Sequence, residues 1–201
     1  MQGAFAAHQE MLESLGATTV DVRQPAHLEG VDAVVIPGGE STTMSMQLER
    51  TGLFDPLQSR LDDGMPALGT CAGMILLANR VGDARPDQRW FRAIDVTVTR
   101  NGYGRQVDSF ETELVPDAAL LAGAIAEGSA DRGTGQLREP TPLHAVFIRA
   151  PRVESVGPGV EVLAEVDGDP VLCRQGPIMV TSFHPELTPD TRIHEAFLKL
   201  L

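Results

Sequence analysis

The chain has 201 residues, of which 42% are hydrophobic, and a chain of this length and composition can bury the core of one domain. We therefore expect a single domain over residues 1–201. The 28 acidic residues outnumber the 16 basic ones, and the formal net charge of −12 argues against nucleic acid or an anionic membrane surface as a partner. No apolar run approaches the roughly 18 residues of a membrane span, and the first residues lack the features of a signal peptide, so we expect a cytoplasmic protein.

The first part of the chain predicts the helices and strands of an α/β protein. Apolar side chains recur at helical spacing over residues 2–15, and strands are expected at residues 18–22 and 33–36. Helical stretches follow at residues 43–49 and 53–62. A doubly wound sheet normally has a strand before its first helix. This chain opens on a helix, so we expect that the first strand is missing from the chain as given.

A glycine-rich turn follows the strand at residues 33–36, with the sequence Pro37-Gly38-Gly39-Glu40-Ser41-Thr42. Such a turn can cap a helix and leave the backbone N–H groups of its glycines free to stabilise an oxyanion. An ordinary strand-to-helix turn is the alternative interpretation. A phosphate loop is disfavoured, because the Gly-Lys-Ser/Thr ending is absent and Glu40 would repel a phosphate.

The stretch that organises the chain is residues 66–78, where a short apolar strand breaks into Gly69-Thr70-Cys71-Ala72-Gly73 and then resumes with helical character. The two glycines permit the cramped strand-turn-helix of a nucleophile elbow, with the thiol at its apex. A helix that begins at Ala72 directs free backbone N–H groups toward the sulfur and stabilises a thiolate. The second cysteine, Cys173, is expected to be a small buried strand residue with a free thiol.

The second half of the chain predicts mostly strands and a closing helix. The expected elements are strands at residues 93–99, 107–114, 143–149 and 177–183, a hairpin over residues 160–174, and helices at residues 117–126 and 192–201. Residues 128–142 are expected to form a long irregular loop. No internal repeat and no domain boundary are evident.

His184 stands at the end of the strand at residues 177–183 and is followed by Pro185 and Glu186. The residue before a proline is pushed into an extended conformation, in which side chains two residues apart project to the same side. The imidazole and the carboxylate can therefore face one site. The remaining histidines are interpreted as surface or core residues: His8, His27, His144 and His194.

The order glycine-rich loop, cysteine elbow, histidine and glutamate predicts a catalytic triad. Cys71 would attack a carboxamide carbon and form a thioester, while the backbone N–H groups of Ala72 and of Gly38 or Gly39 would hold the oxyanion. His184 would protonate the departing ammonia and then activate water. Glu186 would fix the tautomer of the imidazole.

The elbow, followed much later by Ser182-Phe183-His184-Pro185-Glu186, resembles the glutaminase domain of the class I, triad-type glutamine amidotransferases. Two further segments resemble signatures of the glutaminase subunits of pyridoxal 5′-phosphate synthase: residues 100–111, which begin Arg100-Asn101-Gly102-Tyr103-Gly104-Arg105, and residues 147–151, Phe147-Ile148-Arg149-Ala150-Pro151. Taken alone, the arginines of the first segment indicate no more than a solvated loop.

This resemblance implies an α/β fold of the flavodoxin-like, three-layer type with a mixed, mostly parallel sheet. It implies a glutamine pocket formed by these residues: Gly38, Gly39, Glu40, Ser41, Arg100, Ile148 and Arg149. It also implies hydrolysis of L-glutamine to L-glutamate and ammonia without a metal or cofactor, and a hetero-oligomer with a barrel-shaped synthase subunit that receives the ammonia. Relatives begin with a strand that runs into Leu-Gln-Gly-Ala, whereas Met1 directly precedes Gln2 here.

Two alternatives remain open from the sequence. The chain could be the glutaminase of another amidotransferase or a gamma-glutamyl hydrolase, against which residues 100–111 and 147–151 argue. It could also be a noncatalytic regulatory module that keeps the fold. The presence of Cys71, His184 and Glu186 argues against that interpretation.

Overall fold

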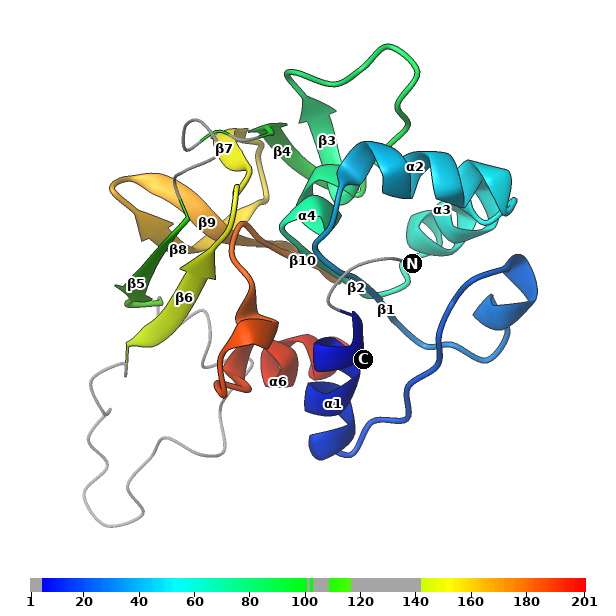
Figure 1. Ribbon diagram of the computed structural model, residues 1–201, viewed down its shortest axis with the longest axis horizontal. Coiled ribbons are helices and arrows are strands. Elements are labelled where there is room, and N and C mark those ends of the chain that lie inside the picture. The colour runs from blue at the N-terminus through cyan, green and yellow to red at the C-terminus, as the bar shows by residue number, and fades with distance from the viewer. Residues whose placement is uncertain (1–4, 101, 103–108, 117–141) are drawn as a thin grey trace.

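The computed structural model describes residues 5–100, 102, 109–116 and 142–201 (Figure 1). The helix expected at residues 117–126, the irregular loop up to residue 141 and most of the segment after Arg100 lie outside the described residues. Within the described residues, no helix has both the length and the apolar character needed to cross a membrane.

Among the described residues, the central sheet has five strands in the order β1-β2-β10-β9-β8. Their bounds are Val34–Ile36 for β1, Ala67–Thr70 for β2, Ile178–Thr181 for β10, Asp169–Gln175 for β9 and Glu161–Val166 for β8. The pairs β1-β2 and β2-β10 are parallel, whereas β10-β9 and β9-β8 are antiparallel. Thr70 lies opposite Thr181 in the β2-β10 pair. The chain therefore leaves both strands at the same edge of the sheet, which is where ligands bind in open α/β sheets.

Two smaller sheets flank the central one. The first has the order β3-β4-β7, with β3 at Ala78–Val81, β4 at Ile94–Thr99 and β7 at Arg152–Val156. The second pairs β5, Phe110–Leu114, with β6, Leu143–Phe147, in antiparallel register. Phe110 lies opposite Phe147, and their rings stack with centroids 4.5 Å apart.

Helices cover both faces of the central sheet. Figure 1 shows α2 (Ser41–Arg50), α3 (Phe54–Asp62) and α4 (Ala72–Leu77) on one side of β1, β2 and β10, and α1 (Phe5–Ser14) and α6 (Arg192–Leu198) on the other. The described part of the chain also contains two short 3₁₀ turns: η1 at Pro25–Leu28 and η2 at Pro185–Leu187.

Alternating side chains of the central strands enter two separate cores. Ile178 and Val180 of β10 belong to the core that contains the buried residues of α2, α3 and α4, whereas Met179 belongs to the core of α1 and α6. This alternation is expected for strands with both faces covered. The predicted mixed α/β fold with three layers is therefore confirmed.

The strand expected at residues 18–22 is not formed. Val20, in the middle of this segment, is exposed, and a cavity of about 940 Å³ is lined by the segment, by α1 and by residues 30–35. A strand needs a neighbour to pair its backbone groups, and within the described residues β1 pairs with β2 only. An apolar pattern without a pairing partner leaves the segment irregular.

Two strands, β3 and β7, are not predicted by the sequence pattern. Helix α4 ends after only six residues, and β3 begins at the next residue. The backbone carbonyls of Leu76 and Leu77 accept hydrogen bonds from Phe91 and Ala93 at 2.7 and 2.8 Å, which replace further turns of the helix. Every residue of α4 is buried, so the run shows no amphipathic period from which its length could be predicted.

Candidate active site

Cys71 occupies the sharp turn between β2 and α4. Its φ of 50° and ψ of −105° are rare for a residue other than glycine, and such strain persists only where the surroundings enforce it. Its backbone N–H donates to the carbonyl of Thr181 at 2.8 Å. A Cβ atom at Gly73 would lie 1.9 Å from the carbonyl oxygen of Ile36. Only glycine therefore lets α4 approach β1 so closely, and the predicted strand-turn-helix is present.

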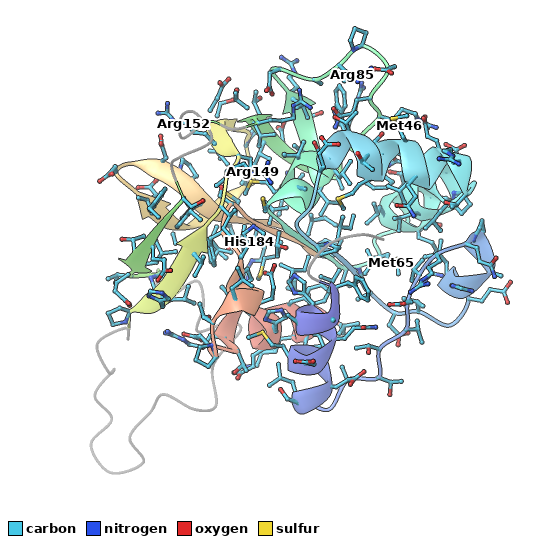
Figure 2. The ribbon with its side chains drawn as sticks, viewed as in Figure 1. Met46, Met65, Arg85, Arg149, Arg152 and His184 are labelled. Atoms are coloured by element: carbon cyan, nitrogen blue, oxygen red, sulfur yellow. The ribbon has the colours of Figure 1, made fainter. Side chains whose placement is uncertain are left out.

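His184 follows β10 and lies beside the elbow. Its backbone N–H donates to the carbonyl of Val146 at 2.9 Å, and its Nδ1 is 2.8 Å from Oε1 of Glu186. Figure 2 shows His184 where the chain leaves β10. The expectation that His184 and Glu186 share an extended segment is wrong, because residues 185–187 form the 3₁₀ turn η2. The turn, not an extended strand, brings the carboxylate back to the imidazole.

The three side chains are coupled electrostatically. Burial alone would lower the pKa of His184, but hydrogen bonds to Cys71 and Glu186 outweigh burial and raise its pKa to about 10. Burial opposes the charged form of Glu186 as well, yet the hydrogen bond from His184 and the nearby imidazole of His8 hold its pKa below the ordinary value. The site therefore favours the imidazolium form of His184, which lies between the sulfur of Cys71 and the carboxylate of Glu186.

The loop at residues 37–40 lies directly against the histidine. A Cβ atom at Gly38 would lie 2.4 Å from Cε1 of His184, so the backbone of this residue touches the imidazole ring. Within the described residues, the backbone N–H groups of Gly38, Gly39 and Ala72 donate no hydrogen bond. Free N–H groups of this kind are what an oxyanion requires.

Glu40 and Ser41 connect this loop to α2. The carboxylate of Glu40 accepts hydrogen bonds from the backbone N–H groups of Thr42 and Thr43 at 3.1 and 2.7 Å, and thereby caps the helix. Burial opposes ionisation of Glu40, but the hydrogen bond from the hydroxyl of Thr43 and those from the backbone N–H groups of Thr43 and Thr42 hold its pKa below the ordinary value. Ser41 is buried as the first residue of α2.

Arg100 reaches the same helix end. Its Nη1 donates to Oγ1 of Thr42 at 3.0 Å, and its Nη2 donates to the carbonyl of Asp83 at 2.7 Å. Ile148 approaches from the other side, because its carbonyl oxygen is 3.9 Å from the sulfur of Cys71. Arg149 is exposed, has a φ of 45° and lies on the segment between β6 and β7 (Figure 2). It makes no hydrogen bond or ion pair with another described residue.

Comparison with known families tests the resemblance to glutamine amidotransferases that the sequence predicts. The family model described as the SNO glutamine amidotransferase family matches residues 1–201. The chain belongs to this family. The resemblance stated from the sequence is thus confirmed.

Named relatives are similar over the whole chain. A pyridoxal 5′-phosphate synthase subunit PdxT from Corynebacterium jeikeium (strain K411) is 48% identical, over 100% of this chain and 93% of that relative. A protein of the same name from Roseiflexus sp. (strain RS-1) is also 48% identical, over 100% of this chain and 96% of that relative.

Solved structures share the fold of this amidotransferase. A crystal structure described as a glutamine amidotransferase is 41% identical, with a TM-score of 0.82 over 99% of this chain and 94% of that chain. A putative GMP synthase component from Thermoplasma acidophilum is 17% identical, with a TM-score of 0.59 over 100% of this chain and 88% of that one. The second likeness concerns the fold alone.

Two buried histidines of the amidotransferase were not expected at the site. His8 on α1 and His194 on α6 are interpreted from the sequence as surface or core residues, yet Nε2 of His8 lies 3.4 Å from Oε2 of Glu186. A histidine on the apolar face of a helix is a weak signal that a polar partner lies beneath it. The sequence does not say which partner, because the contact joins residues 178 positions apart. Among the described residues, no group of three or more histidine, cysteine, aspartate or glutamate side chains could hold a metal ion.

Proposed function

We propose that this chain is a glutaminase that hydrolyses L-glutamine to L-glutamate and ammonia through Cys71, His184 and Glu186. The observation that carries the proposal is the buried imidazole of His184, which interacts with the sulfur at the strained elbow and donates from Nδ1 to Glu186. This arrangement gives a nucleophile, a proton carrier and a group that orients the carrier.

The charge state of the site suits the first half of the reaction. The Cys71 thiolate attacks the carboxamide carbon of glutamine, and the developing oxyanion accepts hydrogen bonds from the N–H of Ala72 and from Gly38 or Gly39. The raised pKa of His184 keeps its imidazole protonated near neutral pH. The proton on Nε2 can therefore pass to the departing amide nitrogen as the tetrahedral intermediate collapses, which releases ammonia and leaves a thioester.

The second half reverses these roles. The neutral imidazole of His184 removes a proton from water, which attacks the thioester carbonyl carbon. Collapse of the second tetrahedral intermediate breaks the carbon–sulfur bond, releases glutamate and restores the imidazolium beside the Cys71 thiolate. Throughout both halves Glu186 accepts the hydrogen bond from Nδ1, which keeps Nε2 facing the substrate.

The remaining pocket residues suit the charged end of glutamine. The guanidinium of Arg100, held by Thr42 and Asp83, can pair with the α-carboxylate, because Arg matches carboxylate geometry. Glu40 and Ser41 lie at the adjoining helix end, and Glu40 supplies negative charge for the α-ammonium group. Ile148 and Arg149 would border the pocket on the side of the Cys71 sulfur.

The ammonia would pass to a partner. The relatives named pyridoxal 5′-phosphate synthase subunit support the proposal that this chain works with another subunit of such a synthase. We propose that the two form a hetero-oligomer, in which the partner is the barrel-shaped subunit that the sequence resemblance implies. Direct transfer has a chemical reason, because ammonia released into neutral water is protonated and loses its nucleophilic lone pair. The chain's own chemistry requires no metal or cofactor.

The test is glutamate release from glutamine by the wild-type chain, Cys71→Ala and the matched control Cys173→Ala, each with and without a candidate synthase subunit. Cys173 is buried in β9, and burial raises its pKa to about 12, so its thiol should be inert. We expect activity in the wild type and the control and a loss of several orders of magnitude in Cys71→Ala. Activity in Cys71→Ala, or hydrolysis of a γ-glutamyl peptide in preference to glutamine, would contradict the proposal.

A further inference from the structure

A row of buried polar side chains continues from Glu186 to residues of α1 and α6. Oε1 of Glu186 binds His184, and Oε2 faces Nε2 of His8 at 3.4 Å. Nδ1 of His8 in turn lies 2.8 Å from Nε2 of His194. His8 is 2% exposed, His194 is 0% exposed, and the side chain of Glu186 is fully buried. Two further buried side chains therefore follow the carboxylate of the proposed triad: His8, from α1, and His194, from α6.

We propose that His8 is a positioning residue, whose Nε2–H holds Oε2 of Glu186 so that Oε1 stays aligned with His184. The proposal rests on the glutaminase function proposed above. Oε2 has no hydrogen-bond partner among the described residues. The imidazole of His8 is the group beside it: its Nε2, which hydrogen-bonds to Oγ1 of Thr70 at 3.2 Å, lies 3.4 Å from Oε2. A buried carboxylate oxygen without a donor is costly, and a freely rotating carboxylate would lose its alignment with the imidazole.

The hydrogen-bond pattern assigns the protons of both histidines. For Nε2 of His8 to donate toward Glu186, its Nδ1 must be an acceptor, so the N–H of His194 Nε2 must donate to it. This leaves Nδ1 of His194 without a proton, and that atom has no partner among the described residues. Oγ1 of Thr70, the residue before the nucleophile, lies 3.2 Å from Nε2 of His8. His8 therefore touches both the strand that carries Cys71 and the carboxylate that orients His184.

Both histidines act as neutral donors. The charged and titratable groups around His8 are Glu186, His184 and His194, and burial outweighs the attraction of Glu186 to lower the pKa of His8. Burial and the neighbouring His8 likewise lower the pKa of His194 to about 4. Neither imidazole competes with His184 for the negative charge of Glu186 near neutral pH. The arrangement fixes the carboxylate without changing the net charge of the site.

The test compares His8→Leu with His8→Gln. Leucine removes the donor, whereas the amide nitrogen of glutamine can occupy the place of Nε2. We expect kcat for glutamine hydrolysis to fall in His8→Leu by about ten- to a hundredfold, the range that loss of an outer partner costs at metal sites. We expect little change in KM, and His8→Gln should recover most of kcat. His144→Leu is the control, because the side chain of His144 is partly exposed and its ring nitrogens pair with Glu111 and Glu113, away from the site.

A second measurement does not depend on turnover. The rate of Cys71 alkylation by iodoacetamide, followed against pH in the absence of glutamine, reports the thiolate–imidazolium pair. Loss of the His8 donor lets Glu186 take up a proton at higher pH, so the midpoint of the alkylation profile should move to higher pH in His8→Leu and return in His8→Gln. Thermal melts identify any variant that is unfolded.

The role of His194 gives an independent check. His194→Leu should reduce kcat when His8 is present, because His8 then loses the donor that fixes its tautomer. The same substitution should have no further effect in His8→Leu.

A folded His8→Leu with wild-type kcat and an unshifted alkylation profile would overturn the proposal, as would His8→Gln behaving like His8→Leu. Absence of glutaminase activity in the wild type both with and without the synthase subunit would instead reject the proposed function, and the alkylation profile would still test His8.

Discussion

Replacing Gly38 by alanine tests the contact between the glycine-rich loop and His184, the proposed catalytic histidine. The new Cβ would lie 2.4 Å from Cε1 and 3.1 Å from Nδ1 of His184. Carbon atoms pack at about 3.5–4.0 Å, so the ring or the loop must move by about 1 Å. The ring is held at Nδ1 by a 2.8 Å bond to Glu186, and a movement of this size breaks its alignment with Cys71.

Two magnitudes follow from this displacement. A misplacement of about 1 Å can cost about 10²-fold in rate, and overpacking in a buried site costs about 1–3 kcal/mol of stability. We therefore expect Gly38→Ala to lose about 10²-fold in kcat for glutamine hydrolysis while it remains folded. The assay is glutamate release at saturating glutamine, with a thermal melt of each variant.

Gly52→Ala is the matched control. Gly52 has a φ of 68° and open space around its missing Cβ, so alanine there costs about 1–2 kcal/mol of backbone strain without touching the site. It should lose stability and keep its activity. Wild-type kcat in Gly38→Ala would refute the reasoning, and so would an equal loss of kcat in the two variants.

Three further predictions concern the same site. Glu186→Gln should lose less kcat than His184→Ala, because an amide oxygen still accepts the Nδ1–H but stabilises the imidazolium poorly; full activity of Glu186→Gln would show that another group orients the ring. The raised pKa of His184 predicts that its charge contributes stability that is fully present below pH 6.5 and is lost as the pH rises through about 10. The melting-temperature difference between the wild type and His184→Ala should shrink over that window, and a constant difference would contradict the assignment. Finally, the chain alone should turn over glutamine slowly and a synthase subunit should accelerate it by favouring a competent state of the Gly38–Gly39 loop; equal turnover at saturating glutamine with and without the partner would exclude this coupling.

The parts of the fold that could be predicted are those with local signals. The hairpin of β8 and β9 and the helix α6 have turn residues and apolar periods within a few positions of one another. The meeting of Cys71 and His184 was predictable as well, because each follows an apolar strand and parallel strands end at one edge.

The parts that failed depend on distant residues. Residues 18–22 have the composition of a strand, but a strand forms only where a neighbour pairs with it. The contact between His8 and His194 joins positions 186 residues apart, so a single sequence contains no pattern that would reveal it. The way in which Glu186 reaches His184 was also predicted wrongly, because the turn η2 and an extended segment bring the two side chains together equally well.

The close approach that Gly73 permits, because glycine has no side chain, also has a mechanical consequence. Since α4 lies against the carbonyl of Ile36, the end of β1 and the helix behind Cys71 act as one rigid block. Pro37 and the two glycines that carry the proposed oxyanion donors of the loop come directly after this block. On the proposed mechanism, a partner that displaced this loop would move the N–H groups of Gly38 and Gly39 while the sulfur and the N–H of Ala72 stayed in place.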